Sequence, residues 1–248
     1  MGLVRFLHRY LFRQTMPSLA AVYYDRLIES VANFYLQPFC DEVIQVLPRP
    51  ARILDIGTGT GQLTIMLALA NRNLSITGID LSRTCLVLAA QHARQAGISD
   101  RVAFERVNIE NDKWNIDTFD LIISTCSLHH WRHPANVLKA ARKLLRQNGS
   151  IWILDDAAEA TGEQRKRWIA RVQDAGGKRL LFQVVYTFES RFLAYSREDL
   201  VQLGKLAGLR LAEWKILESP FFIAKFVPTF QDQASNRQVQ LQDNYEAG

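Results

Sequence analysis

The chain has 248 residues, of which 48% are hydrophobic and 22% are charged. This is ordinary globular composition, and it excludes the disordered, collagen-like and disulfide-rich classes. The formal net charge of +5 weakly favours an anionic partner such as nucleic acid or a lipid surface. The cysteines Cys40, Cys85 and Cys126 fit neither a disulfide framework nor a metal-ligand spacing, so we expect a reducing, cytoplasmic location.

Residues 1–50 are expected to form an N-terminal helical lid. Within residues 1–14, Arg5, Arg9 and Arg13 lie on one side of a helix whose other side is apolar. Three hypotheses stay open for this helix: a lid packed on the core, an anchor that makes the protein peripheral at a membrane surface, and an organelle presequence. The packed lid is favoured because such helices are the commonest kind.

From residue 51 onward, short apolar runs alternate with amphipathic stretches. This alternation is typical of βα units that build a parallel sheet, and most of the runs are apolar throughout, as strands covered on both faces are. The expected strands are Arg52–Ile56, Leu74–Asp80, Arg101–Val107, Phe119–Thr125 and Ser150–Asp155.

Capping residues mark the helices between these strands. Ser82 is expected to cap a helix that stops at Gly97, and Pro134 to open one that stops at Asn148-Gly149. Farther on, Ser196 starts a capping pattern for a helix that ends at Gly208.

The C-terminal part adds a cap, two strands and a tail. Residues 157–195 are too long for a simple connection and are predicted to form an inserted cap containing a charged helix. The runs Leu209–Leu217 and Pro220–Val227 are separated by only two residues, so they must pair antiparallel. Residues 228–248 are rich in polar residues and are predicted to be a flexible tail.

A glycine loop lies between the first strand and the helix after it. Its sequence, D-I-G-T-G-T-G over residues 55–61, lets the backbone approach a ligand and presents helix amides to a polar or anionic group. The NAD fingerprint fails because its third glycine is absent, and the P-loop fails because no lysine follows Gly61. Asp80 ends the second strand, where a carboxylate can accept hydrogen bonds from ribose hydroxyls.

This glycine loop together with Asp80 resembles class I S-adenosylmethionine-dependent methyltransferases. The resemblance is strongest to small-molecule enzymes similar to those of ubiquinone and menaquinone biosynthesis. It implies an α/β, Rossmann-like methyltransferase domain over residues 51–227, with S-adenosyl-L-methionine as the cofactor. It also implies a seven-stranded, mostly parallel sheet of order 3-2-1-4-5-7-6, with strand 7 antiparallel and helices on both faces.

The resemblance also implies which residues hold the cofactor. The glycine-loop residues would surround the amino-acid half, Asp80 would hold the ribose, and Leu81 and Ile109 would enclose the adenine. Asn108 stands where the family usually has aspartate, and its amide oxygen can still accept a hydrogen bond from the adenine amine. The complete expected set is Asp55, Gly57, Thr58, Gly59, Gly61, Asp80, Leu81, Asn108, Ile109, Ser124, Tyr23 and Tyr24.

Three histidines follow the fourth strand, at the edge where ligands bind in open α/β sheets. His129 and His130 are the candidate catalytic residues, because an imidazole can deprotonate a hydroxyl or thiol acceptor. The alternative is that these rings only pack or orient the backbone. We expect no metal site, since adjacent histidines point apart and no cysteine or carboxylate nearby completes a zinc set with His133.

The function expected from the sequence is methyl transfer to a small, lipophilic acceptor. RNA methylation is a second hypothesis, favoured by the positive charge but lacking a recognisable amine-methylation motif or RNA-binding appendage. A non-catalytic module that binds the cofactor is a third. The sequence specifies neither the acceptor atom nor the oligomeric state.

Overall fold

The computed structural model describes residues 34–47, 50–111, 118–174, 186–187 and 190–229. The expected site residues Tyr23 and Tyr24, the basic helix of residues 1–14 and most of the C-terminal tail lie outside these ranges. Residues 34–46 are helical. Among the described helices, none combines the length and the apolar character that crossing a bilayer requires.

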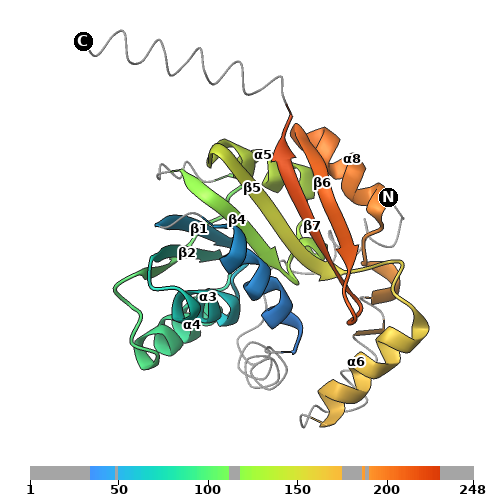
Figure 1. The fold of residues 1–248 in the computed structure, drawn as a ribbon, viewed down its shortest axis with the longest axis horizontal. Helices are drawn as coiled ribbons and strands as arrows, with labels where there is room; N and C mark the ends of the chain where they lie inside the picture. Colours follow the sequence, from blue (N-terminus) through green and yellow to red (C-terminus); the bar gives the residue numbers. More distant parts are fainter. Residues whose placement is uncertain (1–33, 48–49, 112–117, 175–185, 188–189, 230–248) are drawn as a thin grey trace.

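A seven-stranded sheet forms the centre of the described structure (Figure 1), and its strand order is β3-β2-β1-β4-β5-β7-β6. The first five strands pair in parallel, whereas β7 pairs antiparallel with both β5 and β6. The sheet order and the antiparallel seventh strand expected from the sequence are therefore confirmed. The strands are β1 (Ala51–Ile56), β2 (Leu74–Asp80), β3 (Val102–Arg106), β4 (Phe119–Thr125), β5 (Leu145–Asp156), β6 (Leu209–Ile216) and β7 (Phe221–Pro228).

Helices cover both faces of the sheet because successive residues of a strand point to opposite sides. In β1, Ile53 belongs to a core cluster with α3 and the helix of residues 34–46, whereas Leu54 belongs to a cluster with α5 and α8. The helices that follow β1 in the chain include α3 (Gln62–Ala70), α4 (Arg83–Gln95), α5 (Pro134–Lys143), α6 (Gly162–Asp174) and α8 (Arg197–Ala207), with a 3-10 turn, η1, at Leu128–His130.

The expected helix starts are confirmed, whereas one expected helix end is wrong. Ser82 caps α4, and Ser196 forms a capping box with Asp199 at the start of α8. The helix expected to run to Asn148-Gly149 instead ends at Lys143, and Leu145 already pairs with Phe119 of β4. The pairing then shifts register, and Asn148 adopts a φ of 68°. Asn148-Gly149 thus forms an irregularity at the start of β5, because these residues suit a left-handed turn in either setting.

Part of the predicted cap packs against the core. Trp168 of α6 contacts Tyr35, with ring centroids 5.3 Å apart, and Phe221 of β7, with centroids 5.1 Å apart. The Arg165 guanidinium donates hydrogen bonds to the carbonyl oxygens of Ala157 and Ala160, at 2.9 and 2.6 Å. These contacts hold α6 beside the carboxyl end of β5, while the bounds of the cap remain a prediction.

Candidate functional site

The glycine loop leaves β1 through three residues with left-handed backbone. Gly57, Gly59 and Gly61 have φ values of 73°, 55° and 83°, which disfavour any side chain. A Cβ atom at Gly57 would lie 2.0 Å from the Ser127 hydroxyl oxygen, so this glycine is needed for the close approach of the loop that follows β4. A Cβ atom at Gly59 would meet nothing within 4 Å, so the backbone there is open to a ligand.

Asp80 connects the glycine loop to the end of β2. Its carboxylate accepts a hydrogen bond from the Gly59 amide at 3.0 Å and another from the Ser82 amide at 2.7 Å. Burial raises the pKa of this carboxyl group, and the amide donors oppose that shift. Each carboxylate oxygen can accept a further hydrogen bond, as ribose recognition requires.

Asp55 lies beneath the loop as a buried carboxylate, with 1% of its surface exposed. Its Oδ2 atom accepts hydrogen bonds from the hydroxyls of Thr58 at 2.8 Å and Thr64 at 2.9 Å. Its Oδ1 atom has no hydrogen-bond partner among the described residues. Burial is the largest cause that raises the pKa of Asp55 to about 6, against the two hydroxyl donors that lower it.

The remaining expected cofactor residues that the structure describes beyond the glycine loop and Asp80 are Leu81, Asn108, Ile109 and Ser124. Leu81, Asn108 and Ile109 are half-buried at the ends of β2 and β3. The Asn108 side-chain oxygen accepts a hydrogen bond from the Glu110 amide at 3.1 Å, which turns the chain after β3. Ser124 is buried, and its hydroxyl donates to the Ile56 carbonyl at 2.8 Å, joining β4 to β1. A cofactor role for these four residues stays a prediction.

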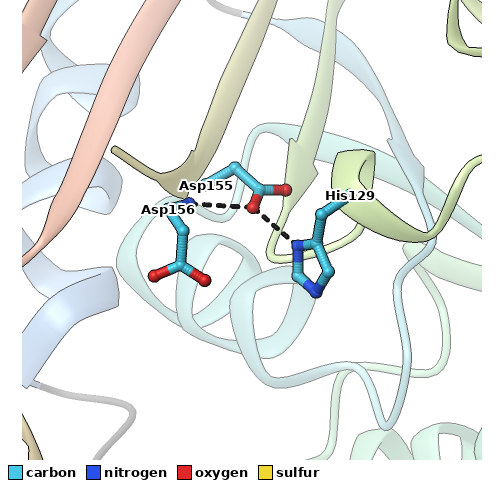
Figure 2. A group of neighbouring side chains, drawn as sticks. All are labelled: His129, Asp155 and Asp156. Atoms are coloured by element: carbon cyan, nitrogen blue, oxygen red, sulfur yellow. Dashed lines mark hydrogen bonds and ion pairs between the residues drawn. The ribbon is translucent and has the colours of Figure 1, made fainter. Parts of the chain in front are cut away.

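His129 forms a hydrogen-bonded pair with Asp155 (Figure 2). His129 lies in η1 after β4 and Asp155 near the end of β5, and their Nδ1 and Oδ1 atoms are 2.6 Å apart. Both residues are buried, with 5% and 0% of their surface exposed. Because a carboxylate only accepts, the Nδ1–H group donates, and a neutral ring then has its lone pair on Nε2. The arrangement suits a general base held in one tautomer.

Asp156 brings a second carboxylate to this pair. It is 6% exposed, and His129, Asp155 and Asp156 each offer a potential ligand atom within 4.8 Å of the others. His130, the other candidate base, is half-buried and packs against His129, with ring centroids 4.0 Å apart and the two planes tilted by 51°. His133 instead pairs with Glu110 at 2.9 Å, so the three histidines do not converge on one point.

Three residues of this site were not predicted from the sequence. Asp155 closed an expected strand without being given a role, and neither Asp156 nor Ser127 was singled out. The Ser127 hydroxyl accepts a hydrogen bond from the Trp131 indole at 2.9 Å, which fixes Ser127 within the loop after β4, beside Gly57. A usable signal was available for the two acids, because consecutive carboxylates at the end of a buried strand are costly unless they have a function.

We expect Asp55 to make the ligand-free protein less stable as the pH rises. Its folded-state pKa of about 6 exceeds the ordinary value of 3.8, so the folded chain binds this proton more tightly than the unfolded chain. The resulting stability is fully present below about pH 4 and is lost as the pH rises through about 6. Asp55→Asn should therefore gain about 2 to 3 kcal/mol over the parent between pH 4 and pH 7.

Urea unfolding of both proteins at several pH values measures this difference. Parallel stability curves for the parent and Asp55→Asn would show that the buried carboxyl group is not the cause.

Parts of this chain are similar in sequence to two curated methyltransferases. A 27-O-demethylrifamycin SV methyltransferase from Amycolatopsis mediterranei is 33% identical over 117 residues, which are 46% of this chain and 43% of that protein. A ubiquinone biosynthesis O-methyltransferase from Nitrosococcus oceani is 32% identical over 102 residues, 41% of this chain and 42% of that protein. The similarity thus spans less than half of the length of these curated relatives.

Solved structures and a family model agree on the fold. An O-methyltransferase from neocarzinostatin biosynthesis, solved with S-adenosyl-L-homocysteine and 1,4-dihydroxy-2-naphthoic acid, superposes with a TM-score of 0.64 at 16% identity. The superposition covers 86% of this chain and 59% of that one, which confirms the fold class. The model of the family described as "Methyltransferase domain" matches residues 49–181, more than half of the chain. The chain therefore belongs to the methyltransferase domain family, as its glycine loop and Asp80 had indicated.

Proposed function

We propose that the chain transfers the methyl group of S-adenosyl-L-methionine to a hydroxyl oxygen of a small, lipophilic acceptor. The observation that carries the choice of oxygen is the buried pair of His129 and Asp155. Such a pair is useful for an acceptor that must lose a proton, whereas carbon and amine acceptors can react without one. The O-methyltransferases among the similar proteins support the same choice.

The residues at the carboxyl edge fit the cofactor. The open backbone at Gly59 suits the polar amino-acid end, as does the Oδ1 atom of Asp55, which has no partner among the described residues. The Asp80 carboxylate suits the ribose hydroxyls. When bound, S-adenosylmethionine supplies an electrophilic methyl group on a sulfonium, and the protein supplies orientation and electrostatics.

In the proposed mechanism, His129 removes the proton of the acceptor hydroxyl at Nε2. The Asp155 carboxylate holds the Nδ1–H group, which places the lone pair of the neutral ring on Nε2 and stabilises the imidazolium that forms. Burial of both side chains excludes water and strengthens this interaction.

The proposal extends to the domains, the location and the partners of the chain. Residues 1–50 as a lid, residues 157–195 as a cap and residues 228–248 as a tail remain proposals, as do the cytoplasmic location and a membrane contact through residues 1–14. We propose no nucleic-acid partner, because the rifamycin and ubiquinone relatives carry small-molecule names. A non-catalytic module is disfavoured, since it would have no need for the His129–Asp155 pair.

The cofactor assignment predicts binding of S-adenosylmethionine and S-adenosylhomocysteine, and no binding of NAD. Asp80→Ala should weaken cofactor binding by about 1.5 to 3 kcal/mol, the range for a lost hydrogen bond to a charged group. Asp100→Ala is the control, because Asp100 is exposed and its carboxylate pairs with the neighbouring Arg101. Calorimetry measures these affinities in the parent and in both variants. Tight NAD binding, or parent-like affinity of Asp80→Ala, contradicts the assignment.

The proposed base predicts unequal effects at the two adjacent histidines. His129→Ala should lower turnover about 10²-fold or more with nearly unchanged cofactor affinity. Asp155→Asn should also lower turnover, because an amide can donate to Nδ1 and favour the wrong tautomer. His130→Ala should stay within a few-fold of the parent.

Formation of S-adenosylhomocysteine, measured on a phenol found by screening, reports these rates. Parent-like turnover by His129→Ala on that phenol would leave the ring an orienting or packing group.

A further inference from the structure

We propose that His92 of α4 is a positioning residue for the cofactor. Its ring fixes the peptide group between Thr60 and Gly61, and with it the shape of the glycine loop. His92 acts through the backbone of the loop and not by touching the cofactor. The inference rests on the proposed function in one respect, since it takes the glycine loop as the place where S-adenosyl-L-methionine binds.

A hydrogen bond joins the ring of His92 to the glycine loop. The Nδ1 atom of His92 lies 3.1 Å from the carbonyl oxygen of Thr60, and the contact is partly buried. Because a carbonyl oxygen only accepts, the ring donates its Nδ1–H group. The two residues are 32 positions apart in the sequence, so this hydrogen bond is a tertiary contact between α4 and the loop.

The same side of α4 also packs against the loop. Ala89 and His92 are three positions apart on α4, and residues at this spacing are neighbours on one face of a helix. Ala89 is fully buried, and a Cβ atom at Gly61 would lie 3.0 Å from the Cβ atom of Ala89. The packing of Ala89 thus sets how closely α4 approaches the loop, and His92 adds a directed contact one turn farther along the helix.

The peptide group between Thr60 and Gly61 is the part of the loop that needs such a contact. Gly59 and Gly61 flank Thr60 with φ values of 55° and 83°. Glycine adopts positive and negative φ about equally readily, so neither glycine resists rotation of this peptide group strongly. His92 binds its carbonyl oxygen, while its Gly61 amide donates to the Thr58 carbonyl at 3.0 Å. Both polar atoms of the peptide group are therefore held.

This peptide group connects the two parts of the loop that suit the cofactor. The backbone at Gly59 is open on one side of it, and α3 begins at Gln62 on the other. The first amides of a helix have no partner inside the helix and favour an anionic group such as the carboxylate of the cofactor. A rotated peptide group would shift these two parts relative to each other. Loss of the His92 hydrogen bond should therefore weaken cofactor binding.

The test compares two side chains of similar shape at residue 92. His92→Asn keeps a donor at the position of Nδ1, because the side-chain amide can turn its nitrogen toward Thr60, whereas His92→Leu has no donor. We expect His92→Asn to bind S-adenosylhomocysteine within about twofold of the parent. His92→Leu should bind it about three- to tenfold more weakly, the range for one lost hydrogen bond, as calorimetry measures.

The order of the two variants separates positioning from a role in helix stability. Leucine is a better helix former than asparagine, so a role in the stability of α4 alone predicts that His92→Leu binds at least as well as His92→Asn. The hydrogen bond predicts the opposite order. Urea unfolding verifies that both variants are folded under the conditions of the binding measurement.

Gln91→Asn and Gln91→Leu are the matched controls, because Gln91 is the exposed neighbour of His92 on α4. Both should bind S-adenosylhomocysteine as the parent does. Equal affinity of His92→Asn and His92→Leu, tighter binding by His92→Leu, or an equal loss in Gln91→Leu overturns the proposal. If His92→Leu does not fold, His92→Ala takes its place as the variant without a donor.

Two parallel measurements distinguish a failure of this inference from a failure of the proposed function. Weaker binding by Asp80→Ala without a difference between the two variants at His92 overturns this inference alone. A difference between those two variants without methyl transfer to any phenol overturns the proposed reaction alone. No binding of S-adenosylhomocysteine by the parent overturns both.

Discussion

Parallel pairing of β2, β1, β4 and β5 is the constraint on which the site depends, because it brings four carboxyl ends to one edge of the sheet. Asp80 ends β2, the glycine loop leaves β1, His129 follows β4 and Asp155 lies near the end of β5. The parallel register thus brings residues that are far apart in the sequence to the same edge of the sheet. The loops that follow these strands add residues to an edge that the strand register has already aligned.

Two close contacts turn that edge into one site. The Gly59 amide donates to Asp80, which fastens the cofactor half of the site across β1 and β2. Ser127 lies so close to Gly57 that no side chain fits between them, which fastens the loop of His129 to the glycine loop. The proposed cofactor and the proposed base are therefore placed relative to each other by packed backbone, and this rigidity is what orientation of two reactants requires.

This arrangement buries acidic side chains, which lowers the stability of the fold. Asp55, Asp155 and Asp156 are all buried at the same edge, and the Oδ1 atom of Asp55 and the Oδ2 atom of Asp155 have no partner among the described residues. Buried carboxylate oxygens without a hydrogen-bond partner destabilise a fold, and such groups are common where proteins bind ligands and do chemistry. We infer that burying these carboxylates makes the ligand-free protein less stable.

Much of the fold was predictable because its signals are local. The capping patterns at Ser82 and Ser196, the apolar strand runs and the two-residue turn before β7 each act within a few residues. The start of β5 was not predictable, since Asn148-Gly149 suits a helix end and a strand irregularity equally. The pairing of His129 with Asp155 was not predictable for another reason. The two residues are 26 positions apart in the sequence, and only the register of β4 with β5 brings their side chains together.

A crystal structure of the protein with S-adenosylhomocysteine tests the central claim most directly, because it shows whether one edge serves both halves of the reaction. We expect the ribose hydroxyls to donate to Asp80, the amino-acid end to lie over the glycine loop near Asp55, and the sulfur to face Nε2 of His129. An adenosine group bound away from Asp80, or a sulfur atom directed away from His129, would contradict the account.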